Sequence, residues 1–152
     1  MATTAKSVRL FVMKKIAAKA IPFVRRSGLR VDIFERGHVR CSMPLKPNKN
    51  HIGTMYAGAL FTLAEMPGGV LFLSSFDNKA FFPIVKELTM KFVKPATETI
   101  TVDITMSEER IQELETEAKE NGKVEFVLEG ELKNTAGDVV AISRGVYQLR
   151  SR

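Results

Sequence analysis

The chain has 152 residues, of which 45% are hydrophobic and 26% charged, which is the composition of one globular domain. Its single cysteine, Cys41, excludes an intrachain disulfide, and we expect a cytoplasmic location. No apolar run approaches the roughly 18 residues of a membrane-spanning helix, so a membrane is not an expected partner.

Positive charge is concentrated in the first 31 residues. Eight of the 23 Lys and Arg lie there with no acid, so the rest of the chain holds 15 basic and 17 acidic residues, a net charge of −2. The overall charge of +6 therefore belongs to the N-terminal segment. Nucleic-acid-binding domains combine a basic face with a recognisable reading module. The sequence contains no such module, so nucleic acid is not an expected partner either.

The N-terminal segment KSVRLFVMKKIAAKAIPFV has apolar residues at close to helical spacing, namely Val8, Phe11, Val12, Ile16 and Ala20. This pattern predicts an amphipathic helix within residues 1–28 that lies on the domain with its lysines in solvent. Two alternatives remain open, a membrane-surface helix and a cleaved organelle presequence, because the segment is basic and acid-free. Pro22 and Gly28 are predicted to mark the exit from this helix.

The next elements are two strands and an apolar helix. The stretches LRVDIFE and HVRCSMPL alternate apolar and polar residues and predict strands joined at Arg36-Gly37. After a polar loop, residues 56–73 are almost wholly apolar and predict a helix. Apolar residues surround this helix on all sides, and a helix of that kind has to be buried.

The second half of the chain predicts four strands and a surface helix. The first strand covers Ile84–Val93, with Val85, Glu87, Thr89 and Lys91 on one face and Ile84, Lys86, Leu88, Met90 and Phe92 on the other. A strand over residues 98–106 follows. A helix capped by Ser107 and ended by Gly122 comes next, and two last strands flank a turn at residues 135–138.

The order of these elements predicts the fold class. Strands occur in blocks rather than in alternation with helices, which indicates an antiparallel α+β fold. An antiparallel sheet wrapped around the one buried central helix is the simplest solution. We therefore expect a single domain over residues 29–152, preceded by the N-terminal helix.

The segment NHIGTMYAGALFTLAE, residues 50–65, resembles the signature of the acyl-CoA thioesterase branch of the hotdog fold. That signature has an Asn, a Gly, a His-Gly-Gly that opens the helix, and an acid nine residues after the His. Asn50, Gly53 and Glu65 match it, whereas residues 56–58 read Tyr-Ala-Gly. The later phrase KFVKPA also resembles the family. The closest resemblance is to an uncharacterised thioesterase-like subgroup, the DUF4442 type.

The resemblance implies hydrolysis of an acyl-CoA or acyl-carrier thioester without a cofactor. Glu65 would be the general base or the nucleophile, and Asn50 would orient the water or the carboxylate. The backbone amides of Ala57 and Gly58, in the first helical turn, would bind the oxyanion. Tyr56 cannot act as a base near neutral pH, but its hydroxyl can donate a hydrogen bond. Some family members place a helper hydroxyl on the strand after the helix, and here that place falls on Val85.

The spacing of these groups bears on the number of chains at the site. Glu65 follows Gly58 by seven residues, so the two lie on one helix face but roughly 10 Å apart along the axis. One carboxylate cannot serve the donors at the start of its own helix over that distance. The family solves this with a dimer, in which one subunit supplies the donors and its twin the carboxylate. A homodimer or a dimer of dimers is therefore expected.

Each functional assignment has a structural alternative that the sequence leaves open. Glu65 could cap a neighbouring element or pair with a lysine across the subunit interface, and Asn50 could be a turn residue. Lys91, Lys94 and Arg144 could meet the phosphates of coenzyme A (CoA) or be solvated strand charges. Tyr56 and Phe61 could line an acyl tunnel or pack in the core.

Two rival functions also remain open. The first is a non-catalytic hotdog protein that binds an acyl or other apolar ligand. The second is a membrane-surface or assembly module led by the basic helix. Other chemistries are disfavoured, because His38 and His51 lack metal-ligand spacing. His38 should also point away from Cys41, across the strand that holds both.

Overall fold

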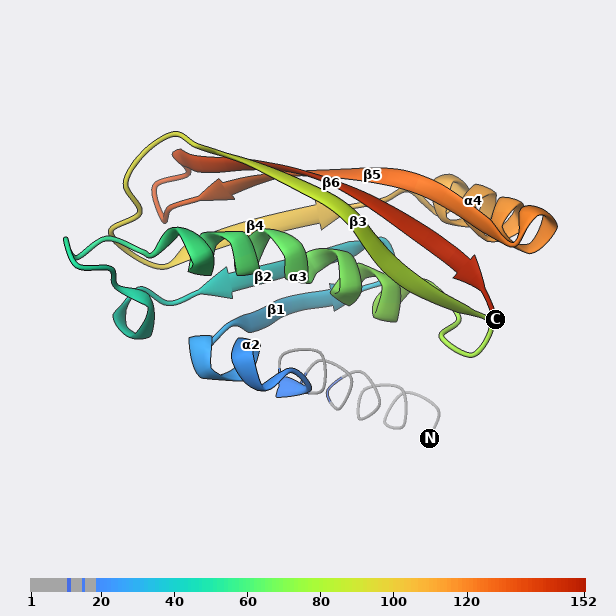
Figure 1. Cartoon of the computed structure of the whole chain (residues 1–152), viewed down its shortest axis with the longest axis horizontal. Coiled ribbons are helices and arrows are strands. Elements are labelled where there is room, and N and C mark those ends of the chain that lie inside the picture. The colour runs from blue at the N-terminus through green and yellow to red at the C-terminus, as the bar shows by residue number, and fades with distance from the viewer. Residues whose placement is uncertain (1–10, 12–14, 16–18) are drawn as a thin grey trace.

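The computed structural model describes Phe11, Lys15 and residues 19–152 (Figure 1). Most of the predicted N-terminal helix lies outside the described residues, so its amphipathic character and the boundary after residue 28 stay predictions. The first described helix is α2 (Pro22–Ser27), which Gly28 ends with a left-handed φ of 75°. Pro22 opens this short helix, because proline suits a first helical position. That it also marks the exit from the preceding helix stays a prediction.

In the described part of the chain, six strands form one sheet in the order β1-β2-β4-β5-β6-β3. Their bounds are β1 (Arg30–Glu35), β2 (His38–Met43), β3 (Phe81–Phe92), β4 (Ile100–Thr105), β5 (Lys123–Lys133) and β6 (Val139–Ser151). Every neighbouring pair is antiparallel. The α+β class predicted from the sequence is confirmed. The two edges of the sheet are β1 and β3.

The helix α3 (Ala57–Ser75) lies inside the curl of this sheet and packs against all six strands. Figure 1 shows it in front of β2 and β4. Leu63, Val70 and Leu71 on this helix are almost fully buried. The helix is long and apolar enough to meet the length and composition of a membrane span, contrary to the expectation above. More than half of it is buried against the sheet, as befits the core helix of a globular fold.

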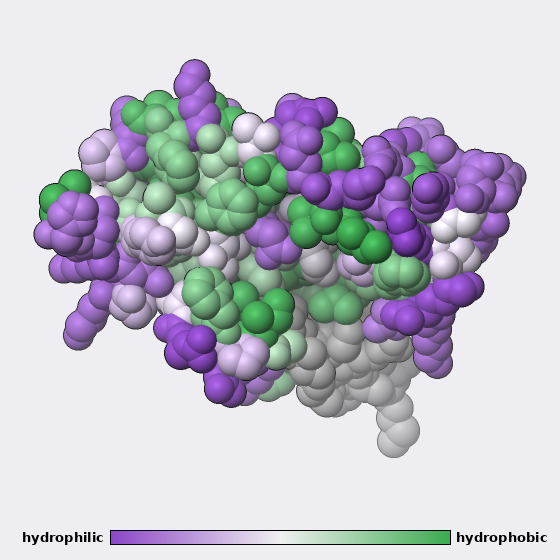
Figure 2. Space-filling model, viewed as in Figure 1, coloured by the Kyte–Doolittle hydropathy of each residue, from purple (hydrophilic) through white to green (hydrophobic). Residues whose placement is uncertain are grey.

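One stripe of α3 is not buried, which differs from the prediction of burial on all sides. It runs along the helix at positions 58, 61, 62, 65, 69 and 73. Phe61 is 43% exposed, and Glu65, Gly69 and Leu73 are half-buried. Figure 2 shows hydrophobic side chains forming a band across this face of the molecule. The sheet of one chain therefore leaves part of an apolar helix uncovered.

The edge strand β3 differs from its prediction in two ways. It begins at Phe81 and includes Pro83, which an edge strand tolerates because one side of it lacks a hydrogen-bonded neighbour. A bulge also shifts the register between Val85 and Glu87. Val85 pairs with the buried Tyr147 and so lies on the inner face of the sheet. The predicted alternation places Val85 on the same face as Glu87. The inner edge of the sheet is thus more apolar than simple alternation implied.

The helix α4 (Glu108–Asn121) closes the far end of the core. Ser107 caps it, accepting a hydrogen bond of 3.2 Å from the Arg110 amide, as predicted. Its three apolar residues, Ile111, Leu114 and Ala118, are completely buried although the rest of the helix faces solvent. A short 3-10 helix, η1 (Lys46–Asn48), lies before the loop that leads to α3. The two ends of α3 thus have different surroundings.

Candidate functional site at the start of α3

The first turn of α3 has free backbone donors. Tyr56 is the N-cap residue, and its side chain makes no capping hydrogen bond. The amides of Ala59 and Leu60 donate to the Tyr56 carbonyl at 2.9 and 3.2 Å. Within the described residues, the amides of Ala57 and Gly58 have no acceptor. Two N–H groups and the positive end of the helix dipole therefore point out of the helix at this place.

Gly58 is packed against the ring of Tyr56. A Cβ atom at position 58 would lie 2.4 Å from Cε1 of that ring, which is closer than atoms can approach. The small size of Gly58 therefore makes room for Tyr56, a role that the sequence did not suggest. Tyr56 itself is 59% exposed. Its ring lies beside the free amides, in the place of the family's His.

The loop before the helix is built by Asn50. Its Oδ1 accepts hydrogen bonds from the amides of Ile52 (3.0 Å) and Thr54 (3.1 Å), and its Nδ2 donates to Thr54 Oγ1 at 2.8 Å. Gly53 allows the turn with a φ of 87°. These contacts correspond to the turn role that the sequence left open. A role for Asn50 in catalysis stays a prediction.

Glu65 lies on the uncovered stripe of α3, and its carboxylate forms no ion pair or hydrogen bond with a described residue. Burial raises the pKa of Glu65 above its ordinary value. A carboxylate with a raised pKa and no partner can accept a proton at a pH closer to neutral than an ordinary glutamate can. The alternative in which it pairs with a lysine across the interface stays open.

Tyr147 is a neighbour of Glu65 that the sequence analysis missed. It is 4% exposed, and its hydroxyl donates to the Glu65 carbonyl at 3.3 Å. Burial, with the charge of Glu65, raises its pKa to about 12, so it stays a neutral donor. The ring fits against Gly68, where a Cβ would lie 2.2 Å from it. Val85, at the family's helper position, pairs with Tyr147 and so lies near the same turn of α3.

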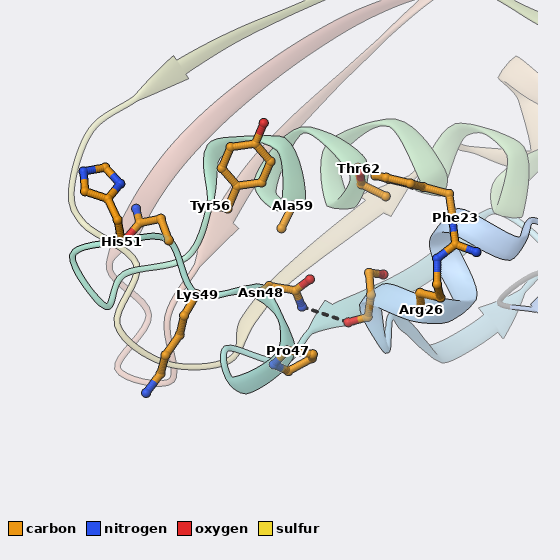
Figure 3. A pocket seen from close by; sticks show the side chains of 11 residues that line it. Phe23, Arg26, Pro47, Asn48, Lys49, His51, Tyr56, Ala59 and Thr62 are labelled. Carbon is orange, nitrogen blue, oxygen red and sulfur yellow. Dashed lines mark hydrogen bonds between the residues drawn. The ribbon is translucent and has the colours of Figure 1, made fainter.

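Two hollows flank the helix start. One, of about 370 Å³, is lined by Ala57 and Leu60 from α3 and by Phe92 and Lys94 at the end of β3. The other, of about 490 Å³, lies between α2, the loop of residues 47–51 and the first two turns of α3 (Figure 3). The free amides thus lie within reach of ligand-sized space.

Comparisons with known proteins agree with this architecture. A model of the DUF4442 family, a domain of unknown function, matches residues 10–148. The chain belongs to the DUF4442 family. The structure of PA5026 from Pseudomonas aeruginosa, described as a probable thioesterase of unknown function, is 54% identical to this chain. The match covers 93% of this chain and 95% of that one, with a TM-score of 0.90. No curated protein matches the sequence significantly.

More distant structures share the fold of this DUF4442 chain. OLEI01261 of Chlorobaculum tepidum, of unknown function, is 22% identical over 92% of this chain and 93% of that one, with a TM-score of 0.81. The thioesterase PA1618 of Pseudomonas aeruginosa is 16% identical over 94% of both chains, with a TM-score of 0.73. The sheet around α3 is accordingly the hotdog fold of the thioesterase-like proteins, as the resemblance implied.

The basic residues considered for CoA binding do not converge in this DUF4442 protein. Lys91 and Arg144 are exposed on the outer face of the sheet, away from α3. Lys94 lines the smaller hollow and lies 3.9 Å from Asp138. A joint phosphate site made by these three residues stays a prediction, with only Lys94 placed near the helix start.

The histidine and the cysteine of β2 lie on opposite faces of the sheet, as predicted. His38 shares the outer face with Arg40, and both contact Asp103, at 2.7 and 3.0 Å. Cys41 is completely buried on the inner face. A thiol–imidazole pair is therefore not formed by these residues. Within the described part of the chain, no group of three or more potential ligands is placed to hold a metal ion.

Proposed function

We propose that this DUF4442 protein hydrolyses thioesters of CoA or of an acyl carrier. The observation that carries the proposal is the pair of free amides, on Ala57 and Gly58, on the helix that also bears the unpaired Glu65. Thioester hydrolysis needs donors for a developing oxyanion and a base for water, and this helix has both. The thioesterase descriptions of its structural neighbours agree with this choice.

The active unit in this proposal is a homodimer. Seven residues separate Gly58 from Glu65, so roughly 10 Å of helix lies between the donors and the base of one chain. The uncovered stripe of α3, with Phe61 exposed, supports a second copy on this face. The long edge strand β3 adds half-buried Leu88 and Met90 and a row of backbone groups that no described strand pairs with, which is a template for a further strand.

The proposed reaction has two steps. The thioester carbonyl oxygen lies against the amides of Ala57 and Gly58, while Glu65 of the second copy removes a proton from a water molecule. The water oxygen bonds to the carbonyl carbon, and the negative charge moves to the carbonyl oxygen. The C–S bond then breaks, and the thiolate takes the proton back from Glu65. The products are a carboxylic acid and a thiol.

The test is release of free thiol from a series of acyl-CoAs of increasing chain length. Wild-type protein should release thiol, and Glu65→Gln should lose nearly all turnover, since an amide cannot accept the proton. A matched control is Glu120→Gln, an exposed acid near the end of α4, which should keep full turnover. Turnover that survives unchanged in Glu65→Gln would rule out this mechanism.

The non-catalytic alternative has one observation in its favour. Tyr56 stands where the family has His, and its exposed ring lies beside the free amides. In that case the same hollows would hold an acyl ligand without turnover. Acyl-CoA binding measured by calorimetry, together with the absence of thiol release from every acyl-CoA, would establish this function instead.

A further inference from the structure

We propose that the larger hollow, between α2 and the start of α3, is a binding site for the phosphate-bearing nucleotide end of CoA. This inference rests on the proposed function, because it names where the carrier of the thioester is held. It also differs from the placement on Lys91 and Arg144, which lie on the outer face of the sheet.

The hollow has the size and composition of a site for an amphipathic anion. Its volume is about 490 Å³, within the range of small-molecule sites. Pro47, Tyr56 and Ala59 supply an apolar wall, and Arg26, Lys49 and His51 supply nitrogen-bearing side chains. Among the described residues, no Asp or Glu lines it. Arg and Lys side chains are the usual protein partners of phosphate groups.

The two cations at this hollow are available to a ligand. Arg26 and Lys49 are exposed, and neither side chain forms an ion pair or hydrogen bond with any described residue. Many exposed cations elsewhere in the described chain do have partners, such as Arg40 with Asp103 at 3.0 Å. An Arg and a Lys that have no partner in the described part of the chain, both at the rim of one apolar hollow, favour a ligand that carries its own negative charge.

Two aromatic side chains flank the hollow. Phe23 and Tyr56 are each 59% exposed, which leaves large apolar faces in water. Figure 3 shows Phe23 reaching from α2 toward Thr62 on α3, with Tyr56 at the opposite side of the pocket. Nucleobases stack on such exposed rings in many proteins. An adenine attached to phosphates can stack on the aromatic rings and also pair with the two cations. A plain acyl chain can contact only the rings.

The walls of the hollow are held in place without a ligand. Asn48 Nδ2 donates to the Ser27 carbonyl at 2.8 Å and to the Pro44 carbonyl at 2.7 Å, which ties α2 to the loop. The Tyr56 amide donates to the Asn48 carbonyl at 2.8 Å, which ties the loop to α3. The site is therefore preformed, and binding does not have to order these segments.

The position also suits the reaction. Tyr56 and Ala59 line the hollow and flank the two free amides in sequence. Thr62, at the α2 side, is five residues beyond Ala57, roughly 7 Å along the helix. A CoA with its phosphates near Arg26 and Lys49 can therefore lead its pantetheine arm past the start of α3.

The test is equilibrium binding of CoA and of pantetheine, which lacks both the phosphates and the adenosine, measured by calorimetry. Wild-type protein should bind CoA at least tenfold more tightly than pantetheine, and the difference should shrink with added salt. Arg26→Gln and Lys49→Gln should each weaken CoA binding by about tenfold. Matched controls are Arg25→Gln on α2 and Lys46→Gln on η1, which remove exposed charges outside the hollow and should change Kd less than twofold.

Three results would overturn the inference: no CoA binding by the wild-type protein, equal affinity for CoA and pantetheine, or equal losses in the Arg26 and Arg25 variants. Comparison of melting temperatures shows that each variant is folded. The proposed function fails separately, through absence of thiol release from every thioester. Loss of CoA affinity in Arg26→Gln without any turnover in the wild-type protein would support the binding site and reject the hydrolase.

Discussion

The two ends of α3 differ in whether their polar groups have hydrogen-bond partners. At its end, Arg36 donates to the Ser75 carbonyl and forms a two-pronged pair with Glu108 at 2.7 and 2.8 Å. The Gly37 amide donates to Ser75 Oγ at 3.0 Å. At its start, the side chain of the N-cap residue Tyr56 makes no capping hydrogen bond, and the amides of Ala57 and Gly58 have no acceptor among the described residues. The end of α3 is buried and its polar groups are hydrogen-bonded, whereas the start borders a hollow and keeps backbone donors for a ligand. One helix therefore contributes to stability at its end and to binding at its start.

The largest effect that this comparison predicts is a loss of activity on substitution of Glu65, which lies on the uncovered stripe of α3. Glu65→Gln should lower kcat by about 10²- to 10⁴-fold, the usual contribution of a general base. Because burial raises the pKa of Glu65, the acid limb of the wild-type pH–rate profile should lie above the ordinary glutamate range. An acid limb at about pH 4 would contradict this role.

The same substitution should stabilise the protein at neutral pH. The pKa of Glu65 is higher in the folded than in the unfolded chain, so the ionised form is disfavoured by folding. Below about pH 4 both states are protonated, and Glu65 costs nothing. As the pH rises through the raised pKa, the wild-type protein loses stability that Glu65→Gln retains. Thermal melts from pH 4 to pH 8 should show a gap in melting temperature that opens as the pH increases.

A smaller effect on activity is expected from closing the start of the helix. Tyr56→Ser introduces an N-cap hydroxyl that can accept from Gly58 or Ala59, which should stabilise the chain by about 1 kcal/mol relative to Tyr56→Ala. The same bond competes with an oxyanion for the first-turn amides. The kcat of Tyr56→Ser should therefore fall about tenfold or more below that of Tyr56→Ala. Equal kcat values would mean that these amides take no part.

The smallest effect is expected when the contacts at the C-terminal end of α3 are removed. Arg36→Met removes the contacts to the Ser75 carbonyl and to Glu108 and should cost about 1 kcal/mol in urea unfolding, because Arg36 is partly exposed. The matched control is Arg110→Met, whose ion pair with Glu113 is exposed and should contribute less than about 0.5 kcal/mol. The kcat per folded molecule should not change in either variant. A loss of kcat in Arg36→Met would mean that the two ends are coupled.

The fold was readable from the sequence because it depends on local patterns. The apolar run from Tyr56 and the alternation in β4 and β5 identify the core helix and the strands around it. The cap at Ser107 was equally plain, since its partner is three residues away. The bulge at Lys86 was not, because the inward position of Val85 is fixed by pairing with Tyr147, which is 62 residues distant.

The candidate site could be predicted only in part, because some of its contacts join residues that are far apart in the sequence. Glu65 is conspicuous as one charge in an apolar helix, and the resemblance marked Ala57 and Gly58. The use of Asn50 in its own loop and the contact of Tyr147 with the Glu65 carbonyl depend on side-chain placement in the folded chain. The hollow at Arg26 joins α2 to α3 across about 30 residues of chain and has no motif.

The most direct test of the proposed two-chain site is complementation between two defective variants. Glu65→Gln lacks the base, and Tyr56→Ser has its donors capped. If the site takes donors from one chain and the base from its twin, a mixed dimer regains one intact site. Random mixing should then restore about a quarter of wild-type turnover, since half of the dimers are mixed and one of their two sites is intact. Mixed dimers confirmed by mass spectrometry that show no more thiol release than the two parents would contradict the account.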